Sequence, residues 1–226
     1  MDTELVLDGT KIGWHQDRVE AWERGEKIAP ITIDMALTRA CNFGCHYCYA
    51  MLQENDRSVI TQPIIYDFLD DCAEIGVKAI SLVSDGESTI SPVFVDTVVR
   101  GSELGLSMAT GTNGFVLTRR RLEEVLPHLT YLRINISAGE RTRYAEIMGV
   151  KERWFDRVCQ NIRDMVEIKN LSKKYNFLVL EDASHALGAE YNGDKVGSCS
   201  FADATVFSFH PVKMITSIEG GMVVCK

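Results

Sequence analysis

The spacing of apolar and polar residues over the first 170 positions predicts four strand–helix pairs. Short β-branched or apolar runs predict strands at 31–37, 78–83, 106–110 and 131–137. Segments with apolar residues every three to four positions predict helices at 61–74, 92–104, 118–129 and 152–168. Strands that alternate with helices form parallel sheets through right-handed crossovers. The pattern therefore predicts an α/β fold.

The length of the chain limits how much of a barrel these units can form. A complete eight-stranded α/β barrel typically takes about 250 residues, whereas this chain has 226 and its repeat ends near residue 170. We therefore expect a partial (β/α) barrel. In such barrels the functional site lies in the loops that follow the strands. Polar and cysteine residues gather there, at 41–48, 84–87 and 111–114, and Asn135 and Ser137 lie on the fourth predicted strand.

The last quarter of the chain follows a different pattern. Strands are predicted at 176–180, 204–209 and 220–225, and the pair Asn192-Gly193 predicts a hairpin turn. All 14 arginines lie within residues 1–170, whereas residues 171–226 contain five lysines and no arginine. We interpret the chain as two segments of different origin, 1–170 and 171–226, which meet near residue 170.

Composition and charge exclude several classes of partner. The formal net charge is −8, which is unlike the basic surface that holds nucleic-acid phosphates. No apolar run approaches the roughly 18 residues of a membrane span. The first residues have neither the basic start nor the long apolar stretch of a signal peptide. We expect a cytoplasmic protein without nucleic-acid or membrane partners.

Three of the seven cysteines crowd into one loop, Cys41-Asn-Phe-Gly-Cys45-His-Tyr-Cys48. Such crowding in a reducing compartment indicates a metal site rather than disulfides. A [4Fe–4S] cluster usually takes four cysteine ligands, so three would leave one iron open, and Tyr47 could shield the cluster from water. Two alternatives remain at this stage: zinc bound by the three cysteines with His46, and a redox pair formed by Cys45 and Cys48.

The cysteine loop resembles the signature of the radical SAM superfamily, a CxxxCxxC motif with an aromatic residue before the last cysteine. Residues 84–87 resemble that superfamily's Gly-Gly-Glu motif, with Asp85 in place of the first glycine. The order of strands and helices and the stretch 144–149 also fit. The resemblance covers about residues 20–170 and implies a TIM-like barrel of the radical SAM type.

The resemblance implies a ligand set and a reaction. Cys41, Cys45 and Cys48 would hold three irons of a [4Fe–4S] cluster, and S-adenosylmethionine would chelate the fourth. The residues expected to contact this cofactor are Tyr47, Ser84, Asp85, Gly86, Glu87, Asn113, Asn135 and Ser137. An electron from a flavodoxin- or ferredoxin-like donor would release a 5′-deoxyadenosyl radical, which would act on a small-molecule substrate. The alternatives are a helix cap for Glu87 and structural roles for Asn135 and Ser137.

The second segment resembles part of the DegT/DnrJ/EryC1-type aminotransferases, which use pyridoxal phosphate on nucleotide-linked sugars. Two stretches carry the resemblance, Glu181-Asp-Ala-Ser-His185 and Ser208-Phe-His-Pro-Val-Lys213. The resemblance implies that Asp182 pairs with the pyridinium nitrogen, that His185 lies by the ring, that Ser208 holds the phosphate and that Lys213 forms the Schiff base. It also implies a sugar-related substrate.

Three functional hypotheses follow from the two resemblances. The first, which we favour, is a radical SAM iron–sulfur enzyme with an aminotransferase-like C-terminal fragment. The second is a pyridoxal-phosphate aminotransferase of a nucleotide-linked sugar. The third is a hybrid chain that folds but catalyses nothing.

Overall fold

A computed structural model describes most of the chain. The described residues are 13, 15–52, 58–167, 180–184, 186–191, 193–200, 202–209, 215–217 and 220–225.

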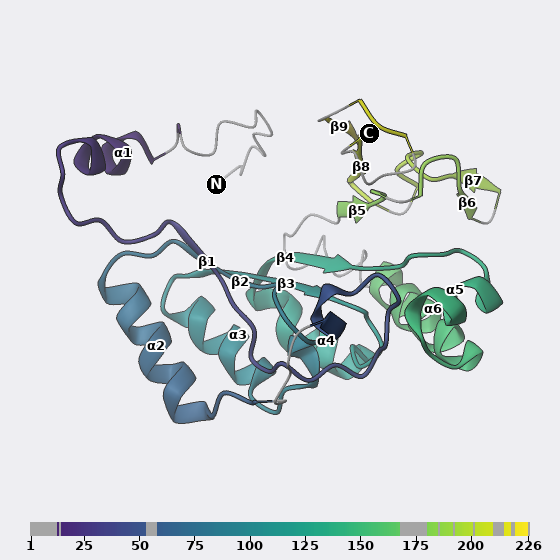
Figure 1. Cartoon of the computed structure of the whole chain (residues 1–226), viewed down its shortest axis with the longest axis horizontal. Coiled ribbons are helices and arrows are strands. Elements are labelled where there is room, and N and C mark those ends of the chain that lie inside the picture. Colours follow the sequence, from purple (N-terminus) through teal and green to yellow (C-terminus); the bar gives the residue numbers. More distant parts are fainter. Residues whose placement is uncertain are drawn as a thin grey trace.

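A four-stranded parallel sheet forms the centre of the first segment, with its strands in chain order (Figure 1). The strands are β1 (Thr32–Asp34), β2 (Ala79–Leu82), β3 (Ser107–Thr112) and β4 (Leu129–Ile134). Parallel neighbours joined by crossover helices are the geometry of one side of a (β/α) barrel. The predicted fold class is therefore confirmed.

Helices connect the strands and continue beyond the last one. The longer ones are α1 (Gln16–Glu23), α2 (Gln62–Glu74), α3 (Phe94–Glu103), α4 (Arg119–Val125), α5 (Arg141–Met148) and α6 (Glu152–Glu167). Short 3₁₀ turns are η2 (Tyr49–Leu52), η3 (Ser88–Ile90) and η4 (Leu126–His128). Pro127 lies in η4, where its missing N–H ends the α-helical bonding that was predicted to reach residue 129.

The main core lies between the sheet and helices α2, α3 and α4, which cover one face (Figure 1). Ile80, Leu82 and Met108 alternate along β2 and β3 toward this face and are almost fully buried. Gly101 allows α3 to approach the sheet, because a Cβ there would lie 2.2 Å from the Met108 sulfur. A second buried cluster, of Phe43, Tyr144, Met148 and Val158, lies apart from this core.

The structure differs from the sequence-based expectations in two places that affect the site. Helix α5 was not predicted, because three of its eight residues are charged and only Tyr144 and Met148 are fully buried. Strand β4 ends at Ile134 rather than at residue 137. Asn135 and Ser137 therefore follow the strand instead of lying on it.

The C-terminal segment contains short strands in two small sheets. They are β5 (Leu180–Asp182), β6 (Glu190–Tyr191), β7 (Asp194–Lys195), β8 (Ala204–Ser208) and β9 (Gly221–Cys225). The order of the larger sheet is β5-β8-β9, and β6 pairs with β7 as the predicted hairpin. Most of the predicted strand at 176–180, and the expected join near 170, lie outside the described residues. Among the helices that the structure describes, none is long and apolar enough to cross a membrane.

Candidate functional site

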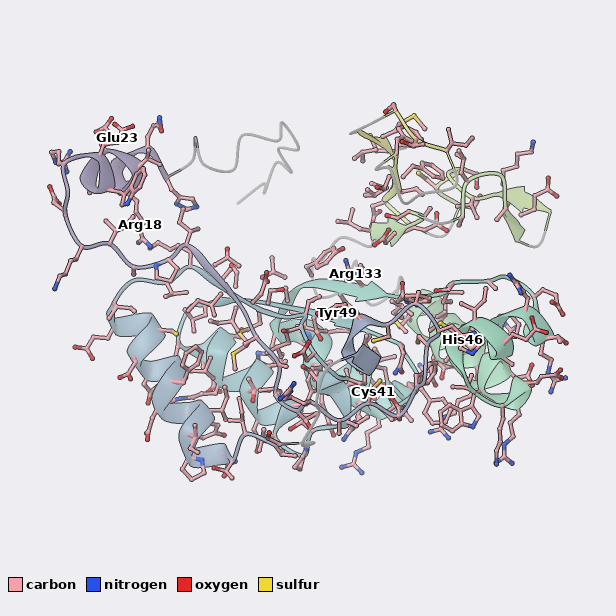
Figure 2. All side chains as sticks on the ribbon, viewed as in Figure 1. Arg18, Glu23, Cys41, His46, Tyr49 and Arg133 are labelled. Carbon is pink, nitrogen blue, oxygen red and sulfur yellow. The ribbon has the colours of Figure 1, made fainter. Side chains whose placement is uncertain are left out.

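The cysteine loop leaves β1 and runs along one end of the sheet. Figure 2 shows Cys41 and His46 toward this end, with Arg18 and Glu23 of α1 at the opposite end. Cys41 is exposed and Cys45 and Cys48 are partly exposed, and all three are free thiols. The Phe43 amide donates to the Cys41 sulfur at 3.4 Å, and the Cys48 amide donates to the Cys45 carbonyl at 3.1 Å. The three sulfur atoms thus belong to one locally hydrogen-bonded loop.

The C-terminal end of helix α5 anchors the cysteine loop. The amides of Gly44 and His46 donate to the carbonyls of Met148 and Ile147, at 3.2 and 2.9 Å. The last carbonyls of a helix have no partner within the helix, so the loop supplies the missing donors. Gly149 ends α5 with a φ of +61°, and a Cβ there would lie 2.1 Å from the Gly44 oxygen. Gly149 therefore permits the close approach that fixes the loop.

Loss of contact with water makes the Cys41 and Cys45 thiols poorer acids than a free cysteine. The pKa of Cys45 is raised to about 11, mainly by burial and in smaller part by the neighbouring negative charges of Cys41 and Cys48. Surrounding protein atoms also partly desolvate the Cys41 thiol, and this desolvation is the main cause of its raised pKa. Metal binding must therefore displace the thiol protons. In the part of the chain that the structure describes, no three His, Cys, Asp or Glu side chains are arranged to share one metal ion.

The loop after β2 packs tightly against the start of the cysteine loop. Gly86 has a φ of +73°, and a Cβ there would lie 2.4 Å from the Thr38 oxygen and 2.6 Å from the Ala40 oxygen. The Glu87 amide donates to that same Ala40 oxygen at 2.9 Å. Among the described residues, Cys199 is the only non-glycine with a positive φ. Asp85 therefore has an ordinary backbone conformation where the related motif has glycine.

The Glu87 carboxylate holds several loops together. It is 4 % exposed and accepts hydrogen bonds from the Thr112 hydroxyl at 2.7 Å and from the Asn113 backbone amide at 2.8 Å. It also caps η3, accepting from the Thr89 amide at 3.2 Å and from the Thr89 hydroxyl. The capping role that the sequence left open is thus present. Its buried carboxylate organises the site rather than facing solvent.

Asn113 and Asn42 extend this network to the cysteine loop. Asn113 is 7 % exposed, and its side-chain amide donates to the Asn42 side-chain oxygen at 2.8 Å. The Asn42 side-chain nitrogen is buried and has no hydrogen-bond partner among the described residues. A buried donor beside Cys41 suits the sulfur atoms of an iron–sulfur cluster, which accept hydrogen bonds that tune it. Together with the three thiols, this unpaired donor fits such a cluster.

Tyr47 links the cysteine loop to the end of β4. Its hydroxyl lies 2.8 Å from the Ser137 hydroxyl and 3.4 Å from the Met148 sulfur. It also accepts a hydrogen bond from the Asn135 side-chain amide at 2.6 Å. Tyr47 and Asn135 are exposed and Ser137 is partly exposed. Ser84 is exposed as well. The expected cofactor residues thus divide into an accessible group and the buried pair Glu87 and Asn113.

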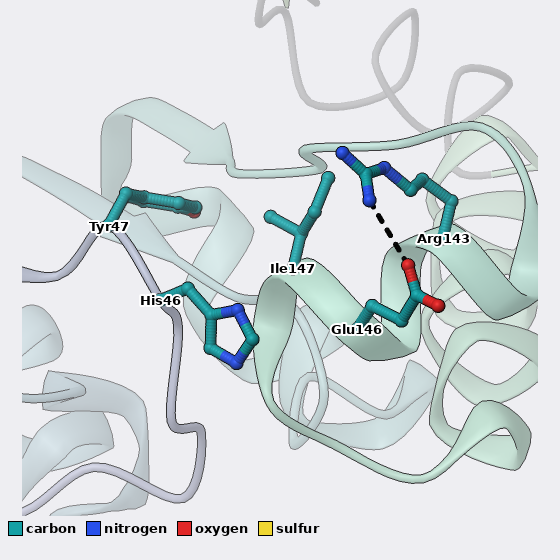
Figure 3. A pocket seen from close by; sticks show the side chains of 5 residues that line it. All are labelled: His46, Tyr47, Arg143, Glu146 and Ile147. Carbon is teal, nitrogen blue, oxygen red and sulfur yellow. Dashed lines mark hydrogen bonds and ion pairs between the residues drawn. The ribbon is translucent and has the colours of Figure 1, made fainter.

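A hollow of about 500 Å³ lies beside the cysteine loop. Figure 3 shows its lining, in which Arg143 and Glu146 form an ion pair at 3.1 Å. The residues that line it are His46, Tyr47, Arg143, Glu146 and Ile147. The sequence had not singled out Arg143, Met148 or Asn42. The position of Asn42 directly after Cys41 was the available signal for that residue, and Met148 lies in the stretch 144–149 already noted.

Two of the four residues expected to bind pyridoxal phosphate, Asp182 and Ser208, lie within the described structure. The Asp182 carboxylate accepts from the Ser184 amide at 3.0 Å and lies 3.8 Å from the Arg133 guanidinium. The carboxylate that the resemblance pairs with the pyridinium nitrogen thus has a cationic neighbour. Ser208 ends β8, whereas His185 and Lys213 lie outside the described residues. Because Asp182 already has a cationic partner, no step through pyridoxal phosphate is proposed.

Comparison with protein families gives two matches. Residues 35–182 match the radical SAM superfamily, and residues 158–226 match the DegT/DnrJ/EryC1/StrS aminotransferase family. The two matches overlap across α6 and β5.

Curated relatives follow the same division. A probable GTP 3′,8-cyclase of Saccharolobus solfataricus is 30 % identical over 147 residues, covering 64 % of this chain and 46 % of that protein. A UDP-4-amino-4,6-dideoxy-N-acetyl-beta-L-altrosamine transaminase of Campylobacter jejuni is 62 % identical over 64 residues, covering 28 % of this chain and 16 % of that protein. The chain thus spans less than half the length of these relatives.

Solved structures with a similar fold include SuiB of Streptococcus suis. Its TM-score is 0.54 at 13 % identity, covering 76 % of this chain and 37 % of SuiB. SuiB bound to the precursor peptide SuiA gives 0.55 at 14 % identity, covering 80 % of this chain and 40 % of that one. These values show a shared fold. Because the superfamily match covers more than half of the sequence and includes the cysteine loop, the chain belongs to the radical SAM superfamily.

Proposed function

We propose that the chain is a radical SAM enzyme in which Cys41, Cys45 and Cys48 hold a [4Fe–4S] cluster that binds S-adenosylmethionine. When bound, the cluster and S-adenosylmethionine supply a 5′-deoxyadenosyl radical after one-electron reduction, for which a flavodoxin- or ferredoxin-like protein is the expected donor. The observation that carries the proposal is the anchored cysteine loop. Its three thiols lie on backbone fixed by α5, beside the unpaired amide of Asn42.

Some residues of the site would hold its loops in place, and others would contact S-adenosylmethionine directly. Glu87 and Asn113 are buried and hold the loops after β2 and β3 in place. Direct contacts with the amino acid and ribose groups of S-adenosylmethionine therefore fall to Ser84, Asn135 and Ser137, which are at least partly accessible. Hydrogen bonds from hydroxyl and amide groups suit both a carboxylate and a ribose. This assignment moves the predicted role of Glu87 from ligand contact to loop organisation.

The proposed substrate is a small molecule, and sugar-bearing nucleotides are the class to test first. The relatives of the first segment are named for GTP, and those of the second are named for a UDP-linked amino sugar. Transamination itself is not part of the proposal, because the Asp182 carboxylate lies 3.8 Å from the Arg133 guanidinium.

Replacing Cys45 by alanine is expected to abolish cluster binding. Removal of one of three protein ligands leaves two, which are too few to retain a cluster that usually takes four. Anaerobic reconstitution with iron and sulfide, followed by iron and sulfide analysis and visible absorbance, measures the effect. The matched control is Cys225→Ala, since Cys225 is an exposed cysteine of β9.

The wild-type protein and Cys225→Ala should both become brown and hold similar amounts of iron and sulfide. Cys45→Ala should stay nearly colourless. A Cys45→Ala protein that binds as much iron and sulfide as the wild type would contradict the proposed ligand set.

A further inference from the structure

The Tyr47 hydroxyl occupies the centre of a hydrogen-bonded group that joins two parts of the proposed site. Tyr47 belongs to the cysteine loop, and its partners Asn135 and Ser137 follow β4, about 90 positions further along the chain. The contacts are short, at 2.6 Å to the Asn135 amide and 2.8 Å to the Ser137 hydroxyl. Met148, next to the glycine that ends α5, supplies a third contact at 3.4 Å.

A phenol suits this position because its hydroxyl both accepts and donates hydrogen bonds. Its oxygen accepts from the Asn135 side-chain amide, and its single proton can go to the Ser137 hydroxyl, the Met148 sulfur or the Cys45 sulfur. Asn135 keeps its side-chain oxygen and a second N–H, and Ser137 keeps further hydrogen-bonding capacity. Tyr47 therefore fixes the orientation of both side chains without using up the groups that a ligand would contact.

We infer that Tyr47 is a positioning residue whose hydroxyl orients Asn135 and Ser137 for S-adenosylmethionine. The inference rests on the proposed function and adds a role that is separate from holding the cluster. Tyr47 lies between Cys45 and Cys48, so the position of its hydroxyl depends on how those two residues are held. The Tyr47 hydroxyl thereby links the cysteine loop to Asn135 and Ser137, in addition to the direct binding of S-adenosylmethionine to the open iron.

The substitution Tyr47→Phe separates the two roles. It keeps the aromatic ring and removes only the hydroxyl, so the reconstituted protein should hold as much iron and sulfide as the wild type. Its dissociation constant for S-adenosylmethionine, measured anaerobically by equilibrium dialysis, should rise by about 3- to 10-fold, as expected for the loss of one or two modest hydrogen bonds. The change that S-adenosylmethionine causes in the electron paramagnetic resonance spectrum of the reduced cluster should require correspondingly more ligand.

The matched control is Tyr66→Phe on α2, which loses a phenolic hydroxyl that contacts Gln62 at 3.4 Å. It should bind the cluster and S-adenosylmethionine as the wild type does. A double-mutant cycle adds specificity: in a Ser137→Ala background, Tyr47→Phe should weaken binding by less than it does alone, because the two groups act through one contact.

The outcomes separate this inference from the proposed function. A wild-type protein that binds a cluster but no S-adenosylmethionine would overturn the proposed function, and the inference with it. A wild-type protein that binds S-adenosylmethionine, together with a Tyr47→Phe protein of equal affinity, would overturn the inference alone. Loss of iron in Tyr47→Phe, to the extent seen in Cys45→Ala, would also overturn the inference, because it would make the hydroxyl part of the cluster loop's own fold.

Discussion

Replacing Gly86 by alanine is expected to lower the free energy of unfolding by about 2–4 kcal/mol, from combined backbone strain and overpacking. Gly86 has a φ of +73°, and the added Cβ would lie 2.4 to 2.8 Å from backbone atoms of Thr38, Ala40 and Arg39. Backbone atoms cannot rotate away as a flexible side chain can. The loop after β2 and the start of the cysteine loop must therefore move apart, and cluster incorporation should fall as well.

The control for this change is Gly105→Ala. Gly105 has a similar φ of +82° but nothing within 4 Å of the added Cβ. It carries the strain of the left-handed conformation without the clash, so urea unfolding should show a clearly smaller loss of stability. Equal losses in the two variants would mean that the close approach at Gly86 contributes nothing.

Replacing Glu87 by alanine is expected to cost about 3–5 kcal/mol, because several buried donors lose their acceptor together. The Thr112 hydroxyl and the amides of Thr89 and Asn113 all donate to this carboxylate. Removing the acceptor of a buried donor costs more free energy than removing the acceptor of a donor that water can reach. The variant should unfold at lower urea concentration than the wild type.

Glu140→Ala provides the matched comparison. Glu140 also caps a helix, α5, through the amides of Thr142 and Arg143, but it is exposed. Water can replace the lost acceptor at this position, so the loss of stability should be smaller than for Glu87→Ala. A Glu87→Ala protein no less stable than Glu140→Ala would show that burial of the Glu87 network adds nothing.

The sequence was sufficient to predict the sheet and the position of the site. Alternation of strand and helix signals predicted parallel order, and the carboxyl ends of parallel strands meet at one edge. The loops with Cys41, Glu87 and Asn113 therefore had to come together, and the structure connects them through Glu87 and Asn42. Each of these inferences needs only local periodicity and one topological rule.

The parts that the sequence did not predict depend on tertiary contacts. The anchoring of Gly44 and His46 by α5 joins residues about 100 positions apart, and no local pattern reports it. The same holds for the burial of Glu87, whose acidic side chain reads as exposed until its donors are placed around it. The Arg133–Asp182 contact likewise changes the interpretation of an aminotransferase motif only once both segments are placed.

The electron paramagnetic resonance spectrum of the reduced, reconstituted wild-type protein tests the central claim most directly, recorded with and without S-adenosylmethionine. We predict an iron–sulfur signal that depends on Cys41, Cys45 and Cys48 and changes when S-adenosylmethionine is added, because its amino and carboxylate groups bind the open iron. An iron–sulfur signal that S-adenosylmethionine leaves unchanged, or no such signal, would contradict the account and favour the hypothesis of an inactive hybrid chain.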